Sequence, residues 1–121
     1  MKINFPRIVR PVDLGEYAPE MKEQKILVWV NPPTGDLSAM LDSYKLSLDG
    51  KKKEDKENAG AAYIESLAVL LSQGETDTHI SPAELQELRD NTRETDPSFW
   101  VWLMSRVMTE INEHRRGLKK A

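Results

Sequence analysis

The sequence contains no cysteine among its 121 residues. This absence excludes disulfide bonds, zinc sites built from thiolates and catalysis by a thiol nucleophile. Residence inside a cell, where disulfides are rare, fits this composition. The chain must therefore be stabilised by burial of apolar surface rather than by covalent cross-links.

Long hydrophobic runs are also missing. The apolar segments are far shorter than the roughly 18–20 residues that cross a bilayer. Residues 1–17 lack the apolar stretch that forms the centre of a signal peptide. We therefore expect a soluble protein that has no membrane partner.

Neither sign of charge dominates, because 17 basic and 20 acidic residues give a formal net charge of -3. Two basic runs are present, KKKEDKE at 51–57 and RRGLKK at 115–120. The first is nearly neutral in sum, and the second has no interleaved aromatic residue for stacking on bases. We interpret both runs as solvent-exposed and expect no nucleic-acid binding.

What is present predicts a single α+β domain over residues 1–121, with a short N-terminal antiparallel β-hairpin packed against about four α-helices. The segments RIVRPVDL and KILVWVNPP are rich in β-branched residues and bounded by Pro and Gly. Apolar residues at helical spacing follow, interrupted by DGKKKEDKEN, which is too polar to offset the entropy of ordering. The predicted segments are a β-hairpin region at 1–33, a helix at 34–48, a mobile charged loop at 49–58, a helical region at 59–116 and a frayed tail at 117–121.

Several residues are of types that are typical at the ends of helices. Asp36 is a candidate N-cap, and Gly74 is placed to end the helix that contains AAYIESLAVLL. Ser81, followed by Pro and then by Glu84, forms a capping box. Asp96, again followed by Pro, predicts the start of the closing helix.

Residues 99–108 of that closing helix read FWVWLMSRVM and contain two of the three tryptophans. Six consecutive apolar residues cannot all lie within one apolar stripe about 100° wide. Three-four spacing assigns one set to the core: Trp100, Leu103 or Met104, Val107 and Ile111.

The side chains off that line are candidates for a partner-binding surface. The apolar candidates are Phe99, Trp102 and Met108, and the charged rim candidates are Arg106, Glu110 and Arg115. Aromatic and Met side chains make adaptable contacts when they are exposed. Alternatively, earlier helices cover both flanks of the closing helix, or the flank packs against a second copy of the chain.

One segment, residues 73–84, imitates a calcium loop. Setting Ile80 at the hydrophobic eighth position places four oxygen-bearing side chains at ligand positions: Glu75, Asp77, Ser81 and Glu84. Two features oppose this reading, because Gln73 would be the first ligand and Thr78 would replace the turn-forming Gly. A calcium-binding helix-loop-helix regulator remains one alternative function.

No other metal or catalytic pattern is evident. His79 and His114 lie 35 positions apart, with no second ligand motif near either one. The sequence contains neither a nucleophile elbow nor a phosphate-binding glycine loop. We expect no enzyme activity, no metal and no cofactor.

Taken in order, these features resemble a known family. The similarity is carried by IVRPVDLGEYAPEMKEQKILVWVNPP, the charged segment, AAYIESLAVLLSQG, ISPAELQELRD and, above all, DPSFWVWLMSRVMTEINEHRRG. The last segment is similar to the Asp-Pro-x-x-Trp-x-Trp-Leu opening and the Ile-Asn-Glu-His close of the small tail assembly chaperones of long-tailed bacteriophages.

This resemblance implies a non-catalytic protein in the host cytoplasm. Such chaperones bind the tape measure protein, keep it soluble and help to recruit tail tube protein around it, and they leave before the virion is complete. A principal alternative is a structural or adaptor subunit of a phage tail or head-tail junction, which stays in the particle.

Overall fold

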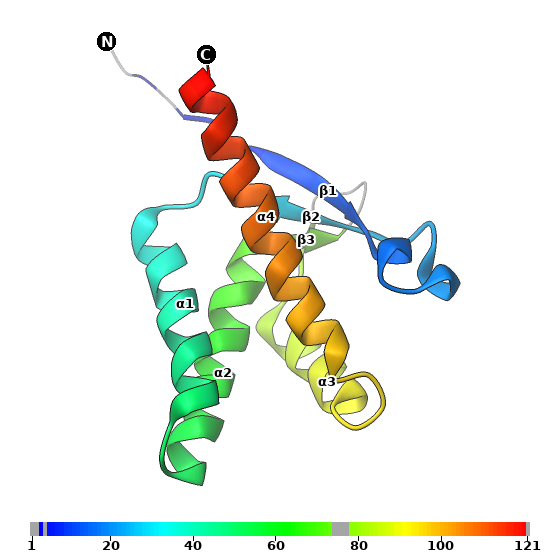
Figure 1. Ribbon diagram of the computed structural model, residues 1–121, viewed down its shortest axis with the longest axis vertical. Coiled ribbons are helices and arrows are strands. Elements are labelled where there is room, and N and C mark those ends of the chain that lie inside the picture. The colour runs from blue at the N-terminus through cyan, green and yellow to red at the C-terminus, as the bar shows by residue number, and fades with distance from the viewer. Residues whose placement is uncertain (1–2, 4, 74–77, 121) are drawn as a thin grey trace.

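The computed structural model describes residues 3, 5–73 and 78–120, and its described part is an α+β fold (Figure 1). The four helices are α1 (Thr34–Asp49), α2 (Lys53–Leu70), α3 (Pro82–Thr92) and α4 (Ser98–Lys120). The strands are β1 (Val9–Asp13), β2 (Lys25–Trp29), β3 (Leu71–Gln73) and β4 (Thr78–His79). Two short 3-10 helices, η1 (Leu14–Glu16) and η2 (Pro19–Met21), connect β1 to β2. The predicted fold class is confirmed.

The strands form one antiparallel sheet in the order β1-β2-β3-β4. The predicted N-terminal hairpin is confirmed, with Val9 opposite Trp29 and Asp13 opposite Lys25. β3 then pairs with the other side of β2, placing Leu71 opposite Val28. From the sequence we predicted that the preceding helix runs to Gly74 and includes residues 71–73. That helix instead ends at Leu70, and Gly74 itself lies outside the described residues. Pairing with β2 and burial of Leu71 outweigh the local helical period.

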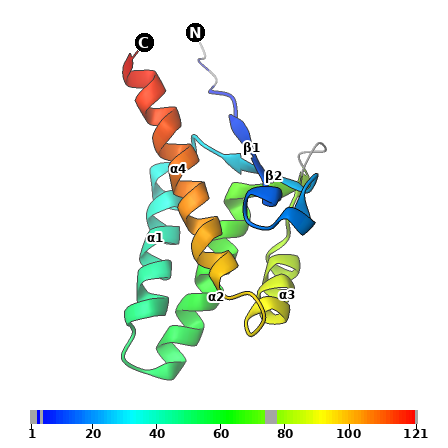
Figure 2. The same ribbon diagram turned by 45° about the vertical axis from the view of Figure 1, so that its right-hand side comes forward.

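α1 and α2 form a helical hairpin, and α4 crosses over the sheet and α2 (Figures 1 and 2). The prediction of a loop over 49–58 is wrong for residues 53–58, which form the first turns of α2. Lys and Glu are good helix formers, and Glu54 and Asp55 favour the positive end of the helix dipole. The actual connection is short and tight, since a Cβ at Gly50 would lie 2.9 Å from the carbonyl oxygen of Leu46.

Two further predicted boundaries need correction. α1 begins at Thr34 after Pro33, so Asp36 lies inside the first turn, where its N–H donates to the Pro33 carbonyl. α4 continues to Lys120 instead of ending before a frayed tail. A single Gly at position 117 costs a helix only about 1 kcal/mol, which is not enough to end it among good helix formers.

The predicted N-cap of α3 is confirmed, because the Glu84 N–H donates to Ser81 Oγ at 3.1 Å, and the Ser81 hydroxyl lies 3.2 Å from the Glu84 carboxylate. The core is formed by the sheet, the α1–α2 hairpin, Leu85 of α3 and one face of α4. Its fully buried large side chains include Val12, Val28, Val30, Met40, Ile64, Leu67, Leu70, Val107 and Ile111. In the described part of the chain, the helices lack the combined length and apolarity that a bilayer crossing requires.

Candidate partner-binding groove

α4 has the predicted core face, since Leu103, Met104, Val107 and Ile111 are all buried. Trp100 is only partly buried. The side chains assigned to a partner surface, in contrast, do not share one exposed flank.

Phe99 is corrected from candidate surface to core, because its side chain is 6% exposed. Its ring lies edge-on to Tyr17 at 5.2 Å between centroids, and Tyr17 also contacts Trp102 at 5.5 Å. Tyr17 belongs to the connection between β1 and β2. That connection folds over this flank of α4 and leaves Trp102 half-buried.

Two of the predicted rim residues, Arg106 and Glu110, form an ion pair with each other within the chain. Arg106 Nε lies 3.0 Å from Glu16 Oε2, and Arg106 Nη2 lies 2.9 Å from Glu110 Oε1. Glu110 is only 8% exposed, so its assignment to a solvated rim is wrong. Arg115 is exposed, as a surface role requires.

Met108 is half-buried and packs against the core. It lies six residues after Trp102, which places the two side chains about 120° apart around an ideal helix. The predicted apolar set is therefore split between two flanks, and one of these flanks is covered by the β1–β2 connection.

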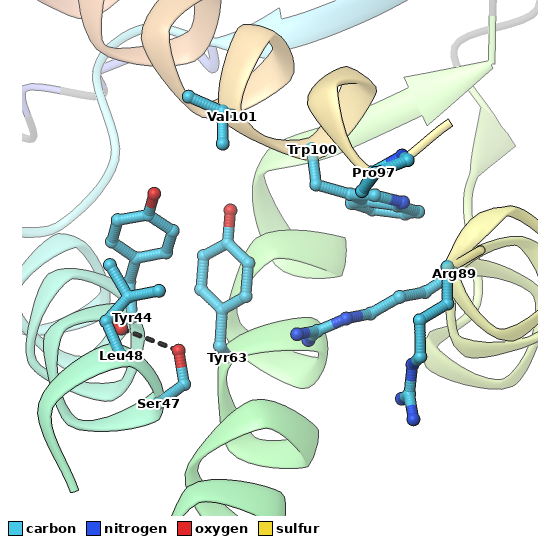
Figure 3. Close-up of a pocket in the computed structure, with 9 residues that line it drawn as sticks. Tyr44, Ser47, Leu48, Tyr63, Arg89, Pro97, Trp100 and Val101 are labelled. Carbon is cyan, nitrogen blue, oxygen red and sulfur yellow. Dashed lines mark hydrogen bonds between the residues drawn. The ribbon is translucent and has the colours of Figure 1, made fainter. Parts of the chain in front are cut away.

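A groove lies elsewhere, between the α1–α2 hairpin and the N-terminal end of α4, with α3 on one side (Figure 3). Its volume is about 310 Å³. The lining residues are Tyr44, Ser47, Leu48, Tyr63, Arg89, Arg93, Pro97, Trp100 and Val101.

Two aliphatic side chains of the groove lining are well exposed. Leu48 at the end of α1 is 59% exposed, and Val101 on α4 is 61% exposed. The rings of Tyr44 and Tyr63 lie 5.1 Å apart (Figure 3). The Trp100 indole N–H donates to Thr92 Oγ1 at 2.9 Å, which holds the ring against the end of α3. Such a surface can desolvate apolar side chains of a partner.

The polar wall of the groove comes from α3. Arg89 reaches from α3 toward Tyr63, and its Nη1 donates to the Gly60 carbonyl at 3.2 Å (Figure 3). Burial lowers the pKa of Arg89, which still remains protonated because free arginine titrates so far above neutrality. Burial also raises the pKa of the Tyr63 phenol, whose hydroxyl lies 3.5 Å from Met104 Sδ.

Sequence reasoning did not identify this groove. Helical periodicity places Tyr44 and Leu48 on the same face of α1 as the buried Leu37 and Met40, yet Leu48 is exposed. Arg89 and Val101 had no distinctive local signal. The groove is produced by the divergence of α4 from the α1–α2 hairpin, which periodicity within one helix cannot reveal.

The structure bears on the calcium hypothesis at its described positions. Gln73 and Thr78 are paired across β3 and β4, so a strand follows α2 where a calcium loop requires a helix. Two of the proposed ligands, Glu75 and Asp77, lie outside the described residues. His79 lies in β4. Within the described ranges, no three His, Cys, Asp or Glu side chains are grouped to hold a metal ion.

Comparison of the chain with protein families, with curated proteins and with solved structures gives no match.

Proposed function

We propose that this protein is a non-catalytic tail assembly chaperone of a long-tailed bacteriophage, which binds the tape measure protein and assists assembly of the tail tube. The support is the resemblance of residues 96–103, DPSFWVWL, and of the wider order of segments to such chaperones. The host cytoplasm is the corresponding site of action.

The observation that carries the proposal is the position of the groove beside that same segment. Pro97, Trp100 and Val101 belong to DPSFWVWL and line the groove. A chaperone needs accessible apolar surface to hold an aggregation-prone client, and exposed apolar patches mark such interaction sites. We therefore propose that the client binds the residues that line the groove, in place of Phe99, Trp102 and Met108.

The test is co-expression of this chain with the tape measure protein encoded beside it, followed by measurement of the soluble client and of its co-purification. The groove variant is the double substitution Leu48→Ser and Val101→Ser. We expect the wild-type chain to keep the client soluble and this variant to lose most of that effect.

The matched control replaces Leu46 and Val69 with Ser, because these residues are 53% and 42% exposed and do not line the groove. Both double variants should keep their fold, since substitutions at exposed positions usually change stability by about 0.5 kcal/mol or less. Equal binding by the two variants would show that the groove is not the client site, and no binding by the wild-type chain would contradict the proposed function.

The protein composition of purified virions distinguishes a chaperone from the alternative, a structural subunit of the tail or the head-tail junction. A chaperone is absent from purified virions, whereas a structural subunit is present in stoichiometric amount. Mass spectrometry of purified particles distinguishes these outcomes directly.

A further inference from the structure

Arg89 has an unusual environment for a cation at the edge of an apolar groove. It is half-buried and donates to the Gly60 carbonyl. Within the described part of the chain, no carboxylate forms an ion pair with it. The neighbouring Arg93 differs, because it is exposed and pairs with Asp90 at 3.4 Å.

A half-buried guanidinium with a single carbonyl partner retains N–H donors that can bind a carboxylate. Arginine presents a planar fork of five donors that matches a carboxylate in two parallel bonds. Such a pair is screened less than an exposed ion pair, because apolar groups exclude water from part of its surroundings. The charge of the groove is therefore complementary to an acidic partner.

The remaining walls select for apolar character. Leu48 and Val101 are exposed apolar side chains of the lining, and Val101 lies beyond the hydroxyl ends of the two tyrosines (Figure 3). A volume of about 310 Å³ is at the low end of the range for ligand sites, so the groove fits a few anchor side chains rather than a whole domain.

We infer that the occupant of the groove is a segment of the client that carries a bulky apolar anchor beside an Asp or Glu, whose carboxylate binds Arg89. This inference rests on the proposed function and adds the chemistry of the recognised segment.

The experiment uses overlapping peptides of about 25 residues that span the tape measure protein. Each peptide is titrated against the full wild-type chain. The tightest binder should contain a large apolar residue within one helical turn of an Asp or Glu. Its affinity should fall as salt is raised.

The same peptide is then titrated against Arg89→Met, Arg89→Lys and a charge-matched control, Arg116→Met, on an exposed part of α4. We expect Arg89→Met to weaken binding at least tenfold, Arg89→Lys to weaken it less, and Arg116→Met to change it less than twofold. The melting temperature of each variant is measured, since Arg89 also contacts Gly60.

A substitution on the peptide avoids any effect on the fold of the chain. Replacing the acidic residue of the peptide with Gln should weaken binding to wild type, yet have little further effect on binding to Arg89→Met. Such non-additivity would establish the pairing.

Three outcomes would overturn the inference. If the peptide binds Arg89→Met within twofold of its affinity for wild type, the inferred ion pair with Arg89 is refuted, but the proposed chaperone function is not. A dimer of the wild-type chain that the Leu48→Ser, Val101→Ser variant dissociates would assign the groove to a second copy. Failure of every peptide and of the intact client to bind would remove the proposed function as well.

Discussion

Replacing Phe99 with Ala tests whether this side chain belongs to the core of the domain or to its surface. Phe99 is 6% exposed and contacts Tyr17, Trp100 and Trp102. Removing a buried Phe side chain typically costs about 3–5 kcal/mol, including the lost aromatic contacts. Because Phe99 lies at the first turn of α4, where the neighbours can partly relax, we expect about 3 kcal/mol.

The corresponding thermal shift follows from chain length. An unfolding entropy of about 2.1 cal/mol/K per residue over 121 residues gives about 0.25 kcal/mol/K, so 3 kcal/mol lowers Tm by about 12 °C. Urea unfolding followed by tryptophan fluorescence measures the free energy, and scanning calorimetry measures Tm.

Val101→Ala is the control on the same helix, because Val101 is 61% exposed and should lose about 0.5 kcal/mol or less. A loss below about 1 kcal/mol for Phe99→Ala, together with loss of client binding, would refute the packing of the β1–β2 connection on α4. It would restore Phe99 to the partner surface.

Three further changes test other parts of the structure. Arg106→Ala should cost about 1–3 kcal/mol in urea unfolding because it leaves Glu110 buried without its cation, and Arg106→Ala with Glu110→Ala should cost less than the sum of the single variants. Ser81→Ala should cost about 1 kcal/mol by the same assay, since α3 loses its N-cap; no change would show that the cap is unimportant. The free energy of unfolding should fall by about 1.4 kcal/mol per pH unit above about pH 10. Burial raises the pKa of Tyr63, so in this pH range only the unfolded chain releases the phenol proton. Tyr63→Phe should remove most of that fall, whereas Tyr17→Phe should retain it.

Much of the fold follows from local sequence patterns. The N-terminal hairpin, the N-cap at Ser81 and the buried stripe of α4 were all predicted, because each depends on residues close together in the chain. Strand alternation, side-chain capping and helical periodicity are short-range effects. The sequence also supplies the resemblance on which the proposed function rests.

The candidate site was not predictable in this way. Local composition suggested a loop at 53–58, but the helix propensity of its Lys and Glu residues extends α2 through this exposed segment. Burial of Phe99 depends on Tyr17, which lies 82 positions earlier and reaches α4 through the connection between β1 and β2.

The sequence by itself determined the N-terminal hairpin, the succession of helices that follows it and the face of α4 that enters the core. Only the tertiary structure decided which of the remaining α4 side chains stay accessible. The β1–β2 connection covers the flank with Phe99, while the α1–α2 hairpin diverges from Val101 and leaves a groove. Periodicity specifies the direction of a side chain from its own helix, but exposure depends on whether a distant segment fills the space in that direction.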